Sequence, residues 1–437
     1  LIELCFMVKV ITYGTYDLLH LGHVKLLERT KALGDYLIVG VTADDFDKTR
    51  GKINVQQSLM ERIEAVRSTG LADEIIVEEY EGQKIDDIQK YDVDIFALGS
   101  DWEGKFDYLN EYCKVIYLPR TEGISSSMIR SEERELILGV YGSGVVTDKF
   151  IDECKFVNGV KAIGASSGYD TFINNVDAVY IYTNPSKHYE QVKYALENKK
   201  HVLCEMPLTR NVAQAQELID LAKKNGCILS MACKTAYATA YNRMLLLAKG
   251  GIIGNIISVD SVCTSIRPID FTDKDQDFQY LSSLNDWGPT ALLPIFQLLG
   301  TDYLKKDIIS LMGDEEHNYD EFTKCTFIYS STCASIKVGR GVKSEGELII
   351  SGTLGYIYVP APWWKTDYFE VRYENAENNR RFFYQLDGEG IRYEIVAFVK
   401  SIQNKKMPII SENIGVAISQ IMEDFNDGIN VTKLNIQ

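Results

Sequence analysis

Residues 13–23 read Tyr-Gly-Thr-Tyr-Asp-Leu-Leu-His-Leu-Gly-His and follow a short apolar run. Gly14 permits a tight turn after a strand, and Gly22 lets the chain lie close to a ligand where a helix begins. His20 and His23 then project from one loop-to-helix junction. A helix N-terminus attracts anions through its free amides and its dipole, and imidazole N–H groups can donate to phosphate oxygens. The stretch predicts a phosphate site on a strand–turn–helix unit.

A structural interpretation of the two histidines remains open on their spacing alone. In that interpretation His20 is a hydrogen-bonded core residue and His23 is a surface cap. The chain has only 5 histidines, and two of them stand at this junction. That placement favours the functional interpretation.

Short apolar runs that alternate with helical patterns predict the domain organisation. At about 150 residues per domain, a chain of 437 residues corresponds to roughly three domains. We expect an α/β class throughout: a Rossmann-like domain over 7–131, a second Rossmann-like domain over 136–235, and an α+β domain with an extended, mostly antiparallel sheet over 236–437. The predicted strands cover 8–11, 36–41, 74–77, 94–98, 114–118, 136–141, 160–165, 178–182, 201–204, 256–264, 325–328, 334–338, 346–351, 355–359 and 368–373.

Composition excludes several classes of protein and partner. Hydrophobic residues make up 46% and charged residues 25% of the chain, as in folded globular proteins. Asp and Glu together number 62 against 46 Lys and Arg, and the net charge of −16 repels nucleic acid and anionic membranes. Any phosphate ligand must therefore be held by a local cluster of donors, and we expect small-molecule partners and no nucleic acid.

Cysteine usage and hydropathy point to a cytoplasmic protein. The 9 cysteines include no Cys-x-x-Cys pair, which predicts reduced thiols and not a disulfide framework or a zinc site. No stretch approaches the ~20 apolar residues of a membrane span, so we expect no membrane insertion. Residues 1–6 are too short for a signal peptide and precede a Met7 that reads as a natural start, so we leave them out of the fold prediction.

The region around the two histidines resembles the His-x-Gly-His nucleotidylyltransferases, and in particular the glycerol-3-phosphate cytidylyltransferase family. The resemblance covers about residues 8–131 and is specific. It rests on motifs in family order at family spacing, namely Asp44-Asp45-Phe46, Arg50-Gly51-Lys52, Glu61-Arg62, Ala72-Asp73-Glu74, Gly99 to Asp107 and Leu118 to Ser126.

This resemblance implies transfer of CMP from CTP to a polyol phosphate, with release of pyrophosphate and no covalent enzyme intermediate. It implies that His20 and His23 bind the reacting phosphates and that Lys52 neutralises phosphate oxygens. Arg120 and Thr121, with the hydroxyls of Ser125 and Ser126, would hold the triphosphate. The implied nucleotide site also includes Gly14, Thr15, Tyr16, Asp17, Gly22, Asp101 and Trp102.

Several roles in this domain have alternatives. Asp17, Asp44 and Asp101 are candidates for Mg²⁺ or nucleotide contacts, because a cation that bridges phosphates usually takes one or two carboxylates. The alternative is that they cap helices, and for Asp44 the two roles are equally supported. Trp102 could pack on the base or fill the domain wall. The family usually has an arginine where this chain has Gly70, and Arg67 could reach the same spot. If it cannot, the resemblance no longer identifies glycerol 3-phosphate as the acceptor, whereas the implied reaction class is unaffected.

Residues 137–437 resemble the glucose-fructose oxidoreductase and inositol dehydrogenase (Gfo/Idh/MocA) family. The first match is a strand that leads into the turn Gly142-Ser143-Gly144. The others are Tyr182 to Pro185 with His188, His201 to Leu208, Ile253 to Ile256, Pro360 to Lys365 and Gly388 to Glu394. The resemblance implies NAD(P) contacts by Gly142, Gly144, Thr183, Asn184 and Glu205.

The chemistry of this second region departs from the family. Met206 stands where the family has a proton-transferring lysine, and a thioether cannot carry a proton. Thr290 stands where histidine or tyrosine is common. Hydride transfer should therefore be crippled unless a group such as Lys234 substitutes. The segment after 160–165 is too short for the usual crossover helix and has no acidic residue for an adenosine ribose, which argues against NAD(P) binding.

The favoured interpretation is a cytidylyltransferase fused to a degenerate oxidoreductase-like module. The alternative is a bifunctional enzyme whose C-terminal half is an active NAD(P)-dependent reductase that makes the polyol phosphate acceptor. A third reading is a non-catalytic nucleotide sensor. By analogy with CDP-polyol use, we expect a role in teichoic acid or capsule synthesis, and by analogy with both families we expect a homo-oligomer.

Overall fold

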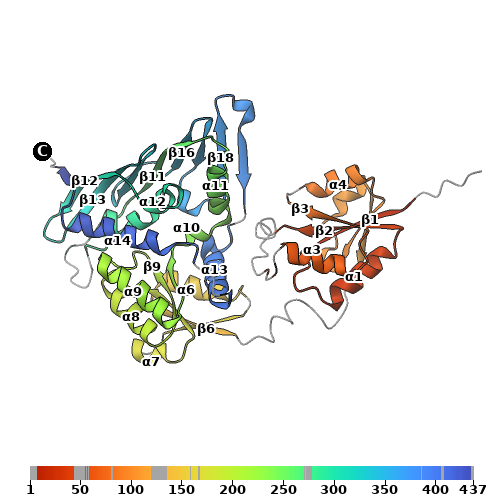
Figure 1. Cartoon of the computed structure of the whole chain (residues 1–437), viewed down its shortest axis with the longest axis horizontal. Helices are drawn as coiled ribbons and strands as arrows, with labels where there is room; N and C mark the ends of the chain where they lie inside the picture. The colour runs from red at the N-terminus through yellow and green to blue at the C-terminus, as the bar shows by residue number, and fades with distance from the viewer. Residues whose placement is uncertain are drawn as a thin grey trace, which may run out of the picture. The chain divides into compact units, whose positions relative to one another are not determined.

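The computed structural model describes residues 7–43, 55, 57, 59–79, 82–119, 135–157, 159–165, 168–269, 271, 278–384, 386–404 and 408–434. The chain forms two compact units, Leu1–Glu135 and Leu136–Gln437 (Figure 1). The α/β class predicted from the sequence is confirmed. The three predicted domain boundaries stay predictions, and residues 136–437 form a single compact unit.

The first unit contains a five-stranded parallel sheet. Its strands are β1 (Lys9–Gly14), β2 (Tyr36–Thr42), β3 (Glu74–Glu78), β4 (Ile95–Gly99) and β5 (Lys114–Leu118), in the order β3-β2-β1-β4-β5. All adjacent pairs are parallel. From the central strand β1 the chain first adds β2 and β3 on one side of the sheet, and then adds β4 and β5 on the other side. Ligands of open α/β sheets bind at the carboxyl ends of the strands at such a switch point.

Apolar residues on both sheet faces hold the helices of this unit. Successive residues of a strand point to opposite faces, so Val10 packs in one core and Ile11 in the other. The helices α1 (Leu21–Lys31) and α3 (Leu59–Ser68) contribute buried residues to the core of Val10. The helix α4 (Gln83–Tyr91) contributes to the core of Ile11. The parallel sheet is thus covered on both faces.

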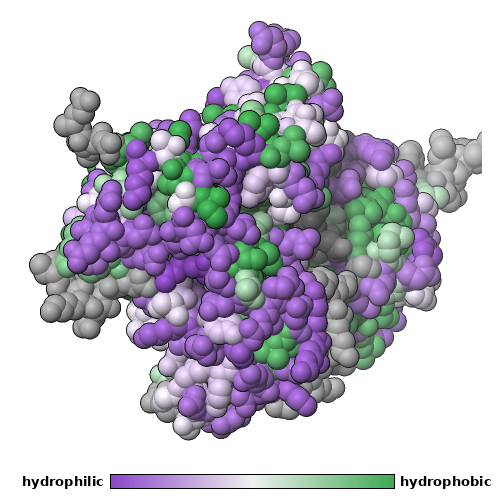
Figure 2. Space-filling view, turned by 60° about the vertical axis from the view of Figure 1, so that its left-hand side comes forward, coloured by the Kyte–Doolittle hydropathy of each residue, from purple (hydrophilic) through white to green (hydrophobic). Residues whose placement is uncertain are grey.

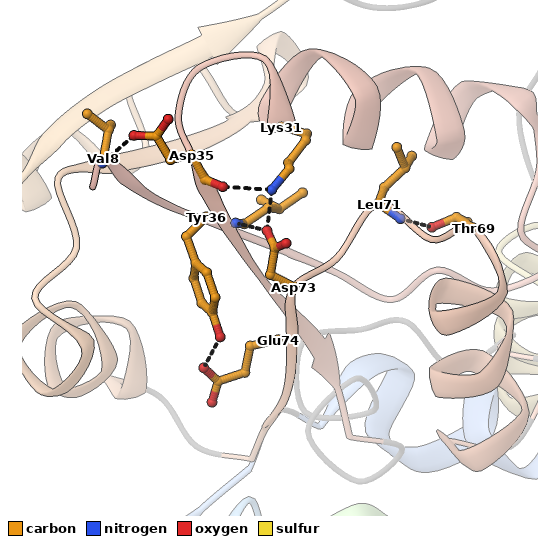
Figure 3. Close-up of polar contacts among 9 residues, drawn as sticks. Val8, Lys31, Asp35, Tyr36, Thr69, Leu71, Asp73 and Glu74 are labelled. Carbon is orange, nitrogen blue, oxygen red and sulfur yellow. Dashed lines mark hydrogen bonds and ion pairs between the residues drawn. The ribbon is translucent and has the colours of Figure 1, made fainter. Parts of the chain in front are cut away.

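Aspartates begin the strands at the amino edge of this sheet. Asp35 Oδ2 accepts a hydrogen bond from the Val8 amide at 2.9 Å, and Asp73 Oδ2 accepts one from the Leu37 amide at 2.6 Å (Figure 3). Lys31 pairs with Asp73 and donates to the Asp35 carbonyl. Burial raises the pKa of Asp73, but the Leu37 amide and Lys31 outweigh it, so the net pKa lies below its ordinary value. These contacts fix where the strands start.

Asp73→Ala is expected to destabilise the first unit by about 1.5 to 3 kcal/mol, because the Leu37 amide loses a charged acceptor. Hydrogen exchange of the β2 amides would measure the loss. Because the folded pKa is lowered, the stabilisation exists above pH 3.8 and disappears as the pH falls further. Asp73→Asn keeps an oxygen acceptor without the charge, so it should lose less stability. Equal stability of Asp73→Ala and wild type would contradict the role.

The second unit begins with another parallel sheet. Its strands are β6 (Leu136–Gly142), β7 (Val160–Gly164), β8 (Ala178–Tyr182), β9 (His201–Glu205) and β10 (Leu229–Ala232), in the order β10-β9-β8-β6-β7. The switch point lies between β6 and β8. The connection from β7 to β8 is short, as expected, yet it forms the five-residue helix α7 (Tyr169–Ile173). The other helices are α6 (Val145–Cys154), α8 (His188–Glu197) and α9 (Val212–Asn225).

A ten-stranded sheet follows, with the order β19-β18-β17-β16-β11-β14-β13-β12-β20 and β15 paired to β11. It is mostly antiparallel, as expected, except for the parallel pairs β11–β14 and β12–β20. Its strands are β11 (Ile256–Ile266), β12 (Lys305–Asp314), β13 (Tyr319–Ile328), β14 (Cys333–Gly339), β15 (Gly341–Val342), β16 (Leu348–Gly352), β17 (Gly355–Val359), β18 (Tyr368–Tyr373), β19 (Arg380–Phe383) and β20 (Val431–Leu434).

In the described part of the second unit, further helices are α10 (Lys234–Tyr237), α11 (Thr239–Lys249), α12 (Ser283–Leu299), α13 (Ile391–Asn404) and α14 (Glu412–Asn426). The helix α12 packs on β11, β13 and β14, and α14 packs on α9 and α12 (Figure 1). The helix α13 returns to contact both α6 and α10. The helix α13 therefore lies against the first helix of this unit, although about 240 residues separate the two in the sequence.

The visible surface in Figure 2 is mainly hydrophilic, and its apolar residues form smaller separate patches. Among the described residues, none of the helices combines the length and apolar character that crossing a bilayer requires.

Candidate active site

The two predicted histidines lie at the switch point of the first sheet. The loop after β1 carries Thr15, Tyr16 and Asp17 and leads directly into α1. Tyr16 is buried, and its ring lies so close to Gly14 that a Cβ there would come within 2.9 Å of the ring. The His20 and His23 rings stack with their centroids 4.0 Å apart. The rings of Tyr16 and His23 make an edge-to-face contact with their centroids 5.5 Å apart. The two imidazoles therefore stand together at the start of α1.

His20 is the N-cap of α1. Its Nδ1 accepts a hydrogen bond from the Gly22 amide at 3.1 Å, and its carbonyl accepts one from the His23 amide at 2.9 Å. A neutral His20 therefore carries its hydrogen on Nε2. The sequence predicted free amides here, but His20 itself binds two of them. Attraction of an anion thus rests on the imidazole N–H groups and the helix dipole, and the first turn of α1 contains no acidic residue.

A buried network supports this loop. Asp17 is buried, and its Oδ1 accepts from the Gln57 amide at 3.0 Å. Arg62 is completely buried, and its Nη1 donates to the Thr15 carbonyl at 2.7 Å and to the Thr42 carbonyl at 2.8 Å. Its Nε donates to the Gln57 carbonyl at 3.2 Å. Arg62 thus ties the ends of β1 and β2 together beneath the loop.

The predicted residues Asp101 and Trp102 lie at the end of the neighbouring strand. They belong to the short helix η1 (Ser100–Trp102), directly after β4. Asp101 is exposed, whereas Trp102 is half-buried and packs against Phe106 at 5.8 Å between ring centroids. Lys105 lies over the same indole. Asp17 and Asp101 therefore follow adjacent strands, and Trp102 packs against the core on this side of the sheet.

Other predicted contacts lie outside the described residues, and their placement stays a prediction. They are Asp44, Lys52, Arg120, Thr121, Ser125 and Ser126. Among the described residues, no group of three or more His, Cys, Asp and Glu side chains is arranged to hold a metal ion. A Mg²⁺ ion here would need substrate phosphates or water as further ligands.

The backbone conformation explains why glycine is suitable at position 70, where the resemblance predicts an arginine. Gly70 follows the end of α3 with φ +68°, a left-handed conformation that glycine adopts without strain. Its amide donates to the Arg67 carbonyl at 3.1 Å. The Arg67 side chain is exposed and pairs with Glu64 on the same helix. Arg67 would therefore have to leave Glu64 in order to bind a phosphate in place of the missing arginine.

The second unit has a glycine turn at its own switch point. A Cβ on Gly142 would lie 2.0 Å from the Tyr182 carbonyl oxygen, so only glycine fits where β6 passes β8. Gly144 has φ +109° and is the N-cap of α6, where Val145 is 83% exposed. This backbone suits a pyrophosphate at the helix N-terminus.

Thr183 and Asn184 follow β8 beside this turn. Thr183 Oγ1 donates to Gln191 at 2.6 Å, and Asn184 caps the short helix η3 (Pro185–Lys187) by accepting from Ser186. Both predicted cofactor residues therefore have local structural partners, which stabilise the loop beside the glycine turn.

The end of β9 carries an acid and the thioether. Met206 is buried and directly follows Glu205, the last residue of β9, so a side chain that cannot carry a proton stands at the end of this strand. Glu205 Oε1 accepts from the Tyr180 hydroxyl at 2.6 Å. Burial raises the Glu205 pKa from 4.5 to about 7, although Tyr180 and Lys234 lower it. Glu205 is thus a titratable residue directly beside Met206, the position where the resemblance predicts a lysine.

The structure also describes Thr290, the predicted substitute Lys234 and a further acid of this unit, Asp286. Asp286 is bound by Arg340 at 2.8 Å, and burial raises its pKa although Arg340 and Arg267 lower it. Thr290 is half-buried in the same helix, α12. Lys234, the predicted substitute, begins α10 and pairs with Glu389 at 2.8 Å.

The stability of the second unit should depend on Glu205 ionisation. Because the folded pKa is raised, the folded state binds more protons than the unfolded state between pH 4.5 and about 7, and the free energy of unfolding falls across that range. The expected loss is on the order of 2–3 kcal/mol. Glu205→Gln should flatten the slope, and Glu197→Gln, exposed on α8, should not. Urea unfolding followed by tryptophan fluorescence at several pH values would test this.

Two comparisons address the first unit. The family model for cytidylyltransferase-like proteins matches residues 11–132. Glycerol-3-phosphate cytidylyltransferase of Bacillus spizizenii is 53% identical over 130 residues, which is 30% of this chain and 100% of that protein. The chain belongs to the cytidylyltransferase-like family. It is accordingly a nucleotidyltransferase, and the histidine junction lies in the part that the family shares.

Comparisons with the second unit show its fold. The model for the oxidoreductase family with an NAD-binding Rossmann fold matches residues 137–233. A variant of the 3-ketoreductase KijD10 from Actinomadura kijaniata, solved with TDP-benzene and NADP, superimposes with a TM-score of 0.60 at 17% identity and covers 69% of this chain and all of that one. Levoglucosan dehydrogenase, solved with NADH and levoglucosan, gives a TM-score of 0.58 at 17% identity over 68% of this chain and 97% of that one. This cytidylyltransferase-like protein thus carries an oxidoreductase-like second unit.

Sequence reasoning missed some residues of these sites. Arg62 was noted only as part of a family motif, although an arginine between apolar helix positions could have signalled a buried charge. Gln57 gave no local signal, because its contacts with Asp17 and Arg62 span 40 and 5 residues.

Proposed function

We propose that the first unit transfers CMP from CTP to a polyol phosphate of the glycerol phosphate type. A phosphate oxygen of the acceptor attacks the α-phosphorus of CTP and forms a new P–O bond. The bond from the α-phosphorus to the oxygen that bridges it to the β-phosphorus breaks, and pyrophosphate leaves with the bonding electron pair. The stacked histidines at the start of α1 are the observation that carries this proposal.

The protein contributes position and charge in this reaction, because phosphoryl-type transfer gives it little covalent chemistry to perform. The His20 tautomer supports the proposal, since Nε2–H can donate to phosphate oxygens while Nδ1 holds the helix start. His23 is stacked beside it as the second donor. We assign charge neutralisation to Lys52 and triphosphate binding to Arg120, Thr121, Ser125 and Ser126.

The carboxylates of Asp17 and Asp101 fit a Mg²⁺ ion that keeps water and phosphate ligands, because they follow adjacent strands and supply hard oxygen donors. Such an ion would neutralise the triphosphate. The Gln57 amide donates to Asp17 Oδ1 at 3.0 Å and fixes the orientation of this carboxylate.

Mass detection of CDP-polyols tests the reaction. The full chain would be incubated with CTP, Mg²⁺ and, separately, glycerol 3-phosphate, glycerol 2-phosphate, ribitol 5-phosphate and an erythritol phosphate. We expect one CDP-polyol and stoichiometric pyrophosphate, with glycerol 3-phosphate as the first candidate because the 53% identical relative carries its name. No product with any acceptor would refute the proposal.

The second unit is proposed to be a degenerate oxidoreductase module. Met206 buried at the end of β9 supports this, because it removes the usual proton donor. The glycine turn around Gly142 fits NAD(P), and the fold relatives were solved with NADP or NADH. Bound NAD(P) would supply hydride, and this chain would contribute the turn that positions its pyrophosphate.

An active reductase that makes the acceptor is the second candidate. The raised pKa of Glu205, about 7, favours it, because a carboxyl near neutrality could exchange a proton in place of Met206. NADH and NADPH oxidation with phosphorylated ketoses separates the candidates. Turnover that Glu205→Gln abolishes would establish the reductase, and absence of turnover would support the degenerate module.

The biological setting is proposed by analogy. CDP-polyols serve teichoic acid or capsule synthesis, so a cytoplasmic step of surface-polymer assembly fits a cytidylyltransferase of this kind. A homo-oligomer is expected, which light scattering would measure.

A further inference from the structure

Three lysines of the second unit converge on one carboxylate. Lys149 Nζ lies 2.9 Å from Glu389 Oε1, Lys234 Nζ lies 2.8 Å from Oε2, and Lys365 Nζ lies 3.0 Å from Oε2. The lysines come from α6, α10 and the short helix η4 (Trp363–Lys365). Glu389 lies in η6 (Asp387–Gly390), directly before α13. Four segments far apart in the sequence thus bring their charges to one point, which we call the lysine cluster (Lys149, Lys234 and Lys365).

The single carboxylate of Glu389 does not balance the three positive charges of the lysine cluster. Contacts from Lys234, Lys149 and Lys365 hold the pKa of Glu389 far below its ordinary value, so it carries a single negative charge against three positive ones. The neighbouring acids Glu153 and Asp387 have their own cation, Arg392, at 2.9 Å and 3.7 Å. In a chain with a net charge of −16, this local excess is unusual.

Glu205 and Glu394 also lie near Lys234 but do not neutralise it. Burial raises the Glu394 pKa well above its ordinary value, and burial raises the Glu205 pKa to about 7. Both carboxyls therefore carry less negative charge near neutral pH than an exposed glutamate does. The lysine cluster keeps its excess positive charge.

The backbone indicates that Glu389 can be displaced. Its φ is +55°, a left-handed conformation that disfavours residues with a Cβ, and it lies between Gly388 at φ +56° and Gly390 at φ +93°. The ion pairs with the lysine cluster offset that cost. The side chains of Lys149, Lys234, Lys365 and Glu389 are 35%, 28%, 41% and 40% exposed, so a ligand from solvent can reach them.

The lysine cluster lies where ligands of α/β sheets bind. Lys149 is on the helix that follows the glycine turn, and Lys234 follows β10, whose Ala232 pairs with Glu205 at the carboxyl edge. Thr235 donates to the Trp364 carbonyl at 2.9 Å, which fixes η4 beside α10. Trp364 packs on Trp287 at 4.8 Å, and Arg267 lies over Trp287 at 5.1 Å. An aromatic wall therefore continues from Lys365, and its Arg267 is paired with Asp286 at 3.5 Å.

We propose that the lysine cluster binds the phosphate monoester of a ligand and that Glu389 occupies the site as an internal anion until the ligand replaces it. A phosphate monoester carries close to two negative charges and three terminal oxygens, which match three ammonium groups better than one carboxylate does. An internal phosphate of a diphosphate has fewer free oxygens and one charge. The ligand is a phosphorylated sugar or polyol, or the 2′-phosphate of NADPH.

Hydrogen exchange with mass detection on the full chain gives a local readout, which separates this site from phosphate binding in the first unit. The probes are inorganic phosphate, glycerol 3-phosphate, NADPH and NADH. We expect exchange of peptides covering residues 386–393 to change at least about threefold on saturation with a phosphate monoester, because Glu389 leaves the lysines. A response to glycerol 3-phosphate assigns the site to a phosphorylated substrate, and a response to NADPH but not NADH assigns it to the 2′-phosphate.

Variants make the test sharper. Lys149→Gln with Lys365→Gln should abolish the response, whereas Lys155→Gln, exposed near the end of the same helix and paired with Asp152, should leave it unchanged. Glu389→Gln should lower the phosphate concentration for half-maximal response by about tenfold, because the competing internal anion is gone. Unchanged exchange in β8 and β9 would show that the variants fold.

The proposal fails if no phosphate monoester alters these peptides, or if the double lysine variant responds like wild type. An equal response to NADH and NADPH without one to glycerol 3-phosphate would also overturn it, because NADH has no monoester. Loss of affinity in Glu389→Gln would show that Glu389 helps to form the site and does not compete for it, and would likewise contradict the proposal.

Discussion

His20→Ala is expected to lower kcat for CDP-polyol formation by about 10²- to 10³-fold, because it removes a preorganised donor to the reacting phosphates. The structure adds a second consequence. The same substitution removes the Nδ1 cap of α1, which should cost about 1 kcal/mol of stability. Initial rates at saturating CTP and acceptor would measure the first effect, and thermal unfolding the second.

His20→Asn separates these two effects. Asparagine is a good N-cap, so the helix start should keep its stability, but it has no imidazole to donate to phosphate. We therefore expect wild-type stability with the same loss of kcat. Near-normal turnover in His20→Asn would show that His20 only caps the helix, and the structural interpretation of the histidine pair would then hold.

Arg62→Met is expected to have the largest effect on the stability of the first unit. It leaves the Thr15, Thr42 and Gln57 carbonyls without the charged donor that they share, at a position completely closed to solvent. The bonds to the Thr15 and Thr42 carbonyls are buried, and each buried carbonyl left without a partner costs about 1–3 kcal/mol, so we expect a loss of about 2–6 kcal/mol. Hydrogen exchange of β1 and β2 amides would report it.

Arg67→Met is the matched control for Arg62, since Arg67 lies on the same helix. Arg67 is exposed and pairs with Glu64, and such surface pairs contribute about 0–1 kcal/mol. Equal stability of Arg62→Met and Arg67→Met would show that the hydrogen bonds from Arg62 to the carbonyls beneath the loop do not hold the histidine junction in place. A loss confined to Arg62→Met, together with lower activity, would identify Arg62 as a positioning residue.

Much of the fold follows from local patterns in the sequence. The strands β5, β8, β17 and β18 have the predicted limits, because each is a short apolar or alternating run that turn residues bound. Others were not predicted. The inner face of β12 buries Lys306 and Ser310, whose polarity hides the alternation. The ion-pair partner of Lys306 is Asp424, which is far away in the sequence.

The helix α12 was not predicted because Pro289 and Pro294 lie inside it, and proline usually ends a helix. Burial against the large sheet outweighs that local preference. Propensity is a weak guide where tertiary packing supplies most of the stability.

Among the candidate site residues, too, those that are close together in the sequence could be predicted and those that depend on distant contacts could not. The histidine junction is contiguous in the chain, so the residues His20, Gly22 and His23 could be recognised together. Arg62 and the lysine cluster depend on contacts between segments that are far apart, and nothing local marks Lys365 or Glu389 as partners. The role of free amides was overestimated, because the pattern does not reveal that His20 caps its own helix.

The pairing of β20 with β12 has a practical meaning for protein production. β20 covers Ile308 to Leu311 in the middle of a ten-residue strand that would otherwise be the border of the large sheet. Uncovered strands of that length offer open backbone groups to other molecules. A chain cut before Val431 should therefore self-associate and precipitate during purification, even though it retains both sites discussed above.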